Sequence, residues 1–240
     1  MVSDHEQKEF IEGTSLLRDE HKLGEISPES LALLEQHSSK WHYQKGQTIF
    51  ESGDYIHNLL YINQGSVVYE LISAEGDKKI VSYVNRFLSS ENYFNKQPIL
   101  YFARALDDTE IYALDNQHIN DILGQPDIRD SLLRSLSALC RILGWQVNDL
   151  AFCSTRVKVC RLLCCYALAM PEGNQFKVTL THQNLAFMTG VHRVTITNIL
   201  TQLRNEGLIE IGRGGHIVIK NWDEVMAIGF GDTLNLANEQ

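Results

Sequence analysis

The chain has 240 residues, a formal net charge of −9 and 44% hydrophobic residues. This length and composition fit two globular domains, each long enough to bury its own core. No stretch approaches the ~20 uninterrupted apolar residues of a membrane-spanning helix, and the N-terminus has no signal-peptide pattern. We therefore expect a cytoplasmic protein without a membrane partner. The five cysteines are an odd number without a CxxC spacing, which argues against a secreted disulfide framework.

The charge is distributed unevenly along the chain. Residues 154–221 hold eight Lys and Arg against three Asp and Glu, whereas the residues on both sides of this segment are acidic. A basic segment in an acidic chain is typical of a nucleic-acid-binding domain. The asymmetry predicts two domains with different partners.

The N-terminal half predicts a small helical cap followed by many short strands. Residues 9–39 carry helical apolar spacing, and Ser27-Pro28-Glu29 is a helix-start signal. Short β-rich runs separated by glycine-containing turns then predict strands at Thr48–Phe50, Leu59–Ile62, Val67–Ile72, Lys79–Val84 and Ile111–Ala113. Closely spaced short strands of this kind indicate a jelly-roll-like β-barrel.

A long helix is predicted from about Asp127 to Phe152. Its leucines step by alternating threes and fours, the seam of a coiled coil, and this seam comprises Leu132, Leu136, Leu139, Leu143 and Leu150. A second line, Leu133, Cys140 and Val147, is expected to face the barrel. Two apolar faces need two partners, so the seam predicts a homodimer, with an intramolecular core helix as the alternative.

Residues 181–219 predict a winged helix-turn-helix. Thr181 is a candidate N-cap, Gly190 suits a tight turn, and a second amphipathic helix follows it. Its buried side is Ile196, Ile199, Leu200 and Leu203. A Gly-rich turn containing Arg213 joins two β-rich runs, which predicts a hairpin whose tip contacts phosphate. The alternative is an ordinary helical hairpin in a core, but the hairpin and the charge argue against it.

The strings YQKGQTIFESGD, LLYINQGSVVYELISAEGDKKIVSY and LTHQNLAFMTGVHRVTITNILTQLRNEGLIEI resemble the cyclic-AMP receptor protein/FNR (CRP/FNR) family of transcription regulators. The resemblance covers roughly Tyr43 to Asn221, and within the family VHRVT is similar to the VHHVT of the CprK type. It implies an α+β fold with three parts: an effector-binding jelly-roll β-barrel (1–125, cyclic-nucleotide-binding-like, with the helical cap), a dimerisation helix (126–153) and a winged helix-turn-helix domain (154–240).

The resemblance also implies which residues meet DNA. The expected set is Thr181, His182, His192, Arg193, Val194, Thr195, Thr197, Asn198 and Arg213. Valine at position 194 can pack on a thymine methyl, and Asn198 pairs with adenine. These two residues predict an A·T-rich palindrome as the target in double-stranded DNA. RNA polymerase is a further partner that the resemblance suggests.

The family's phosphate-binding pattern is not preserved. Glu91 stands where relatives have a glutamate, but the glycine before it is Ser90, and Arg104 lies two or three residues past the arginine position. We therefore expect that the protein does not respond to cyclic AMP.

Aromatic residues occupy this stretch instead and suit an aromatic or phenolic effector, as in CprK-type members. The expected effector set is Phe87, Glu91, Tyr93, Tyr101, Arg104, Leu139 and Leu143. A plain barrel core without a ligand explains the aromatics as well.

Other mechanisms receive less support from the sequence. No cysteine precedes Cys140, which excludes the N-terminal iron–sulfur cluster of the FNR type. His57 and His118 could ligate haem, but they are more simply interpreted as surface residues. Cys160, Cys164 and Cys165 are interpreted as packing residues rather than as a metal or redox cluster. No catalytic motif is present, so we expect no enzyme, metal or cofactor. A thiol switch at Cys140 or Cys153 and a constitutive DNA-binding dimer remain the alternatives.

Overall fold

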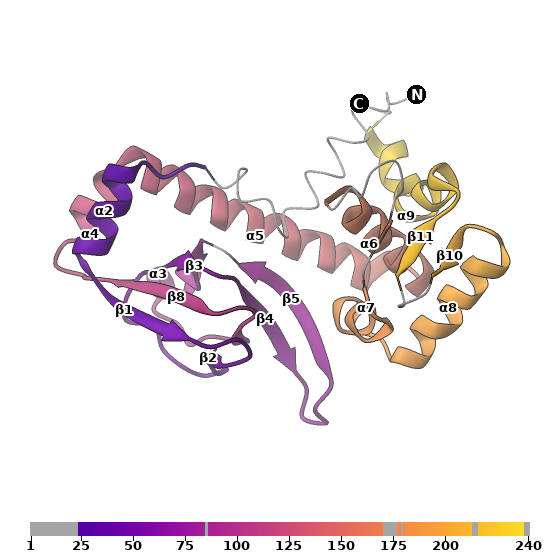
Figure 1. Ribbon diagram of the computed structural model, residues 1–240, viewed down its shortest axis with the longest axis horizontal. Coiled ribbons are helices and arrows are strands. Elements are labelled where there is room, and N and C mark those ends of the chain that lie inside the picture. Colours follow the sequence, from indigo (N-terminus) through magenta and orange to yellow (C-terminus); the bar gives the residue numbers. More distant parts are fainter. Residues whose placement is uncertain (1–23, 85, 170–176, 179, 213–215, 238–240) are drawn as a thin grey trace. The chain divides into compact units, whose positions relative to one another are not determined.

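The computed structural model describes residues 24–84, 86–169, 177–178, 180–212 and 216–237. These residues form two compact units that meet in the sequence between Leu143 and Gly144. The division falls inside the long helix α5 (Pro126–Phe152), whereas the sequence suggested boundaries at both ends of this helix. We describe each unit by itself (Figure 1).

Helix α2 (Pro28–Gln36) opens the barrel unit and begins at the predicted signal. The Ser27 hydroxyl caps the helix by accepting the Ser30 amide hydrogen at 3.2 Å, and Pro28 occupies its first turn. The Asp127 carboxylate at the start of α5 accepts from the Ser27 amide at 2.9 Å and from the Ser30 hydroxyl at 2.8 Å. Both helix starts are therefore tied together.

Two four-stranded antiparallel sheets follow and confirm the predicted jelly-roll. One sheet has the order β1 (Ser38–Tyr43), β8 (Thr109–Leu114), β3 (Leu60–Gln64), β6 (Phe87–Leu88), and the other β2 (Thr48–Phe50), β7 (Phe102–Ala105), β4 (Val67–Ile72), β5 (Lys78–Val84). Strands β1, β6 and β7 and the short helices α3 (Ser90–Asn95) and α4 (Ile119–Gly124) were not predicted from the sequence. Gly65 has a φ of +89°, and a side chain there would collide with Thr109 Oγ1 at 2.6 Å, so this turn requires glycine.

Alternation along the strands produces two apolar clusters. The first lies between the sheets and is built around Val67, Tyr69 and Ile111. The second includes Leu34 of α2, Ile122 of α4 and Leu132 of α5, so it joins the helices to one face of the first sheet. Leucine 132 is only 5% exposed in this cluster.

The faces of α5 differ from the sequence interpretation. Because Leu132 is buried in its own unit, it is not available to a partner, and the predicted seam is wrong at this position. Leu133 is 57% exposed and Cys140 is also exposed, so these two residues of the line expected to face the barrel do not pack on it. Five residues are exposed along the helix: Leu133, Cys140, Leu143, Val147 and Leu150. Leu136 is partly buried against the second apolar cluster.

The second unit holds the predicted winged helix-turn-helix. Helix α6 (Thr155–Ala169) precedes α7 (His182–Thr189) and α8 (Arg193–Asn205). The antiparallel sheet has the order β10 (Ile209–Ile211), β11 (Ile217–Ile219), β9 (Lys177–Val178), and α9 (Trp222–Ala237) packs on α6. Strand β9 and helix α9 were not predicted. Within the described residues, no helix is long and apolar enough to cross a membrane.

Candidate nucleic-acid interface and effector site

The turn between α7 and α8 is built from local signals. Thr181 Oγ1 accepts from the Asn184 amide at 3.0 Å, and Asn184 Oδ1 accepts from the Thr181 amide at 3.2 Å, which forms a capping box. Gly190 ends α7 with a φ of 71° and donates its amide hydrogen to Ala186 O at 2.9 Å. This left-handed residue confirms the glycine-dependent turn that the sequence predicted.

Helix α8 separates its residues into two faces. Ile196, Leu200 and Leu203 are fully buried, and Ile199 is partly buried, as the spacing predicted. The opposite face is exposed, with Val194 at 71%, and it comprises Arg193, Val194, Thr195, Thr197, Asn198 and Gln202. A rigid helix therefore presents a mixed set of donors, acceptors and one apolar side chain, which suits a DNA major groove.

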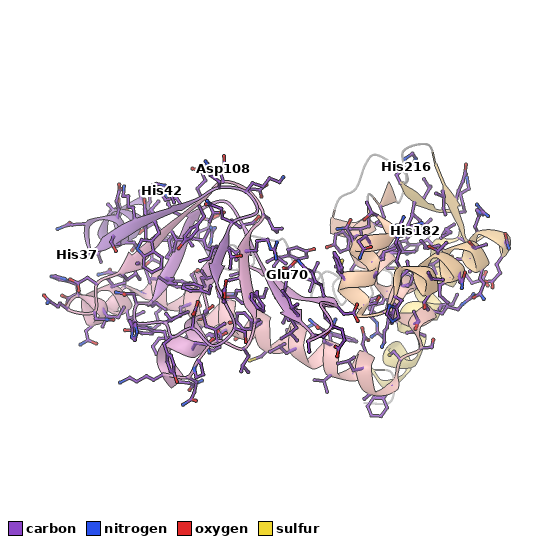
Figure 2. The ribbon with its side chains drawn as sticks, turned by 90° about the horizontal axis from the view of Figure 1, so that it is seen from below. His37, His42, Glu70, Asp108, His182 and His216 are labelled. Carbon is purple, nitrogen blue, oxygen red and sulfur yellow. The ribbon has the colours of Figure 1, made fainter. Side chains whose placement is uncertain are left out.

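His182 joins α7 to this outward face. Thr197 Oγ1 donates to Arg193 O at 3.0 Å, so it accepts from His182 Nδ1 at 2.9 Å. The hydrogen bond requires the Nδ1–H tautomer or the charged ring. Figure 2 shows His182 between the helices of this unit. The structure thus brings together Thr181, His182, Thr197 and the start of α8, while His192 is an exposed N-cap without a side-chain capping bond.

The wing is a short antiparallel hairpin with Ile209 opposite Ile219. Gly212 donates to His216 O at 2.9 Å, and a side chain at Gly212 would collide with the His216 ring, which Figure 2 labels. The hairpin is therefore closed by glycine and histidine at its base. Arg213 lies outside the described residues.

In the barrel, two tyrosines fill the region near the N-terminus of α3. The rings of Tyr69 and Tyr101 stack with centroids 4.0 Å apart. The Tyr69 hydroxyl accepts from the Ser89 amide at 2.5 Å, and the Tyr101 hydroxyl donates to the Glu91 carboxylate. Burial raises the pKa of both phenols well above its usual value, so both stay neutral. The polar atoms of this region are engaged with one another.

The other predicted effector residues are not all gathered at this cluster. Phe87 packs edge-on against Tyr61 in the cluster beneath the helices, with centroids 5.4 Å apart. Tyr93 lies against both clusters and donates to Asn116 Oδ1 at 2.8 Å.

The Arg104 side chain points away from the tyrosine pair. Its Nη2 forms an ion pair with Glu70 Oε2 at 2.8 Å, and Glu70, labelled in Figure 2, alternates along β4 with the inward-pointing Tyr69. Leu139 is partly buried and Leu143 is exposed on α5, and neither belongs to the two apolar clusters of the described residues. Of the predicted effector set, Glu91 and Tyr101 are joined by a hydrogen bond, whereas Phe87 and Tyr93 pack together in the cluster beneath the helices.

Sequence reasoning missed the partners of this pair, Tyr69, Ser89 and Asn92. Asn92 Nδ2 donates to Pro98 O at 3.0 Å, which holds the loop beyond α3. The signal available for Tyr69 was strand alternation, because Val67 and Tyr69 share the inward face of β4. The predicted effector region also differs from an open depression of about 610 Å³ along β1 and β8, which is lined by polar residues such as His42 and Asp108.

The cysteines differ in environment, and all are free thiols. Burial raises the pKa of Cys160 to about 12 and that of Cys164 further, so these thiols are poor nucleophiles. Cys153 accepts from Asn148 Nδ2 at 3.6 Å, and Cys140 is exposed on α5. Among the residues that the structure describes, no cluster of His, Cys, Asp and Glu suits a metal ion.

Comparisons with known proteins match both units. Residues 40–125 match the cyclic nucleotide-binding domain family and residues 157–228 the Crp-like helix-turn-helix domain family. The fumarate and nitrate reduction regulatory protein of Shigella dysenteriae is 25% identical over 202 residues, which cover 81% of this chain and 79% of the relative.

Two solved structures share the fold. OCPA-complexed CprK aligns with a TM-score of 0.67 at 18% identity, over 84% of this chain and 99% of CprK. The c-di-GMP responsive global regulator CLP of Xanthomonas campestris aligns with a TM-score of 0.67 at 19% identity, over 80% of this chain and 99% of CLP. The same fold therefore occurs in proteins with different small molecules, OCPA for CprK and c-di-GMP for CLP.

Proposed function

Because this chain belongs to the CRP/FNR family of DNA-binding transcription regulators, we propose that it is a cytoplasmic homodimer that reads an A·T-rich palindrome under the control of a small molecule other than cyclic AMP. Family members are regulators rather than enzymes. They pair a DNA-binding domain with a ligand-binding domain, and both domain families are matched here. RNA polymerase is a further proposed partner.

The exposed face of α8 is the observation that carries the DNA-binding proposal. Val194 and Asn198 lie one helical turn apart on this face, and both are exposed. Valine packs best on a thymine methyl, and asparagine bonds bidentately to adenine. Thr181, His182, His192, Arg193, Thr195 and Thr197 complete the proposed interface, and Arg213 at the wing would hold phosphate. These side chains favour A·T pairs over G·C pairs.

Selection from a random double-stranded DNA library tests this proposal. We expect enrichment of A·T-rich palindromes whose half-sites lie ~34 Å apart, one turn of B-DNA. The affinity should fall steeply with salt because several phosphates are neutralised. A G·C-rich consensus, or no enriched sequence, would contradict the proposal.

The proposed dimer forms along the accessible face of α5. Leu143 and Leu150 of the predicted seam are exposed on this face, and Leu136 and Leu139 are partly buried along it. The exposed Leu133, Cys140 and Val147 extend the face. A two-fold protein matches the two-fold symmetry of a palindrome. Replacing Leu143 by Asp would place a charge in the interface and should yield monomers.

Sedimentation at micromolar concentration measures the effect. Leu100→Asp is the matched control, because Leu100 is an exposed leucine of the same unit that is not part of α5. A wild-type monomer with intact operator binding would contradict the dimer.

The effector proposal rests on the Tyr69–Tyr101 pair. The Tyr69 hydroxyl accepts the hydrogen of the Ser89 amide at the start of α3, so this amide is already engaged. The proposed effector is therefore a phenolic compound that displaces Tyr101 and donates its own hydroxyl hydrogen to the Glu91 carboxylate. CprK, which shares the fold, is complexed with OCPA. Phe87, Tyr93, Arg104, Leu139 and Leu143 remain proposed contributors.

Calorimetry with cyclic AMP and with phenolic acids distinguishes the possibilities. We expect no binding of cyclic AMP and micromolar binding of a phenolic acid whose hydroxyl donates to the Glu91 carboxylate, and Glu91→Gln should weaken this binding. Micromolar binding of cyclic AMP would overturn the proposal.

A specific observation favours a second candidate, a regulator that needs no barrel ligand. The Tyr69–Tyr101–Ser89–Glu91 cluster already satisfies its own polar atoms. Operator affinity that no aromatic acid changes would support this constitutive dimer. A thiol switch is the remaining alternative, since Cys140 is exposed. It would be supported if oxidation changed the operator affinity of the wild type but not that of Cys140→Ser or Cys153→Ser.

A further inference from the structure

One buried arginine connects three helices of the DNA-binding unit. Arg161 lies on α6 and is 7% exposed. Its Nε donates to Gly229 O of α9 at 3.0 Å, and its guanidinium forms an ion pair with Asp149 near the end of α5. Elements separated by up to 68 residues in sequence thus meet at one cation.

Two aromatic rings border the same guanidinium. The Arg161 Cζ lies 4.9 Å from the Trp145 ring centroid on α5 and 5.2 Å from the Phe230 ring centroid on α9. The two rings meet edge to face, with centroids 6.4 Å apart. Cation–π contacts of this kind stabilise the charge when the site is dry. The last two turns of α5 are therefore bound to α6 and α9 by both charge and aromatic contact.

Gly229 allows α9 to approach α6 closely enough for this arrangement. A side chain at Gly229 would place its Cβ 3.0 Å from Arg161 N and 3.2 Å from Arg161 Cα. Both neighbours are backbone atoms, so they cannot rotate away. By contrast, a side chain at Gly231, two residues further along α9, would meet no atom within 4 Å.

A buried ion pair contributes little net stability. It requires one geometry, because any other arrangement leaves a buried charge without its partner. We propose that α9 acts as a clamp and Arg161 as the positioning residue that fixes the last two turns of α5 on the winged helix-turn-helix. This inference rests on the proposed function, since α5 carries the proposed dimer seam. The clamp would set the spacing of the two recognition helices in the dimer, without contacting DNA.

The test compares a palindrome selected from a random library with a duplex carrying one half-site of the same sequence. In Arg161→Met and Gly229→Ala, half-site affinity should be unchanged, while palindrome affinity falls by two- to thirty-fold, the usual range for network mutations. Amide hydrogen exchange of residues 145–152 should become faster in both variants. Gly229→Ala keeps the test usable if Arg161→Met fails to fold.

Two matched controls should leave all three measurements unchanged. Gly231→Ala adds the same methyl group to α9 in open space. Arg156→Met removes an arginine of α6 that pairs with Glu206 near the surface. Equal losses for palindrome and half-site, or unchanged exchange at residues 145–152, would overturn the clamp. If the wild type selects no DNA, the proposed function fails, and the exchange measurement alone decides for or against the clamp.

Discussion

Polar side chains are hydrogen-bonded to one another in the barrel interior, whereas on the recognition helix α8 they are exposed to solvent. In the barrel, the hydroxyls of Tyr69 and Tyr101 are engaged with Ser89 and Glu91. On α8, the outward polar side chains are exposed on a helix whose other face is fully buried. The first arrangement stabilises one conformation of the protein, whereas the second leaves hydrogen-bonding groups available to another molecule.

This difference has an energetic consequence. Removing a buried polar partner leaves the other group unsatisfied, which costs stability. Changing an exposed residue of α8 should alter binding and leave stability within about 0.5 kcal/mol. Substitutions in the two regions should therefore separate folding from recognition.

The largest effect is expected for Tyr69→Ala. The ring is almost fully buried between the sheets and stacks on Tyr101, so its removal leaves a cavity in the core. We expect a loss of about 3–5 kcal/mol in the free energy of unfolding, measured by urea denaturation. Tyr55→Ala, an exposed tyrosine of the same unit, should change it by less than about 0.5 kcal/mol. Similar losses in both variants would show that the Tyr69 site is not specially packed.

A smaller loss is expected for Tyr101→Phe. The phenylalanine keeps the stack on Tyr69 but removes the donor to the Glu91 carboxylate. A carboxylate that loses a donor in a partly buried site should cost about 1–3 kcal/mol. Tyr55→Phe is the matched control. Unchanged stability in Tyr101→Phe would mean that water replaces the donor, so the cluster would already be open to a ligand.

The regions also differ in how far the sequence predicted them. The N-cap at Thr181, the turn at Gly190 and the buried face of α8 follow from local signals within a few residues, and all are confirmed. Fold class and the positions of β4 and β5 were equally accessible, because alternation and turn residues mark these strands. Strands β1, β6, β7 and β9 were missed.

The barrel interior depends on contacts between distant residues. Tyr69 and Ser89 are 20 residues apart in sequence, and no periodicity reveals that the hydroxyl of one takes the amide of the other. The predicted seam of α5 is wrong at Leu132 for the same reason. Leu132 and Leu133 fit two equally regular lines, and only packing against α2 and α4 decides which one is buried.

On α8, Val194→Glu should change recognition and leave the fold intact. A glutamate accepts a hydrogen bond from cytosine N4, so preference at one base pair should shift toward C·G by ~1–3 kcal/mol. Library selection with the variant measures the shift. Gln202→Glu adds the same charge farther along the exposed face and should leave the consensus unchanged. An unchanged consensus in Val194→Glu would show that Val194 does not face the bases.

The smallest effect concerns Asp127, whose carboxylate is engaged like the barrel tyrosines but lies nearer to solvent. Partial burial raises its pKa, but hydrogen bonds from Ser27, Ser30 and the Ile128 amide lower it by more, so the net pKa lies below the usual value. A carboxyl whose pKa is lower in the folded state stabilises the fold above its unfolded pKa of about 3.9, and this contribution is lost as pH falls through the folded pKa. Asp127→Asn should therefore cost about 1 kcal/mol near neutral pH. The difference in the free energy of unfolding between variant and wild type should narrow below about pH 4, as measured by urea denaturation at several pH values.

Asp130→Asn is the control. It breaks an exposed pair with Arg134 and should cost less than about 0.5 kcal/mol. A gap for Asp127→Asn that stays constant down to pH 2 would mean that the Asp127 carboxylate does not titrate with folding.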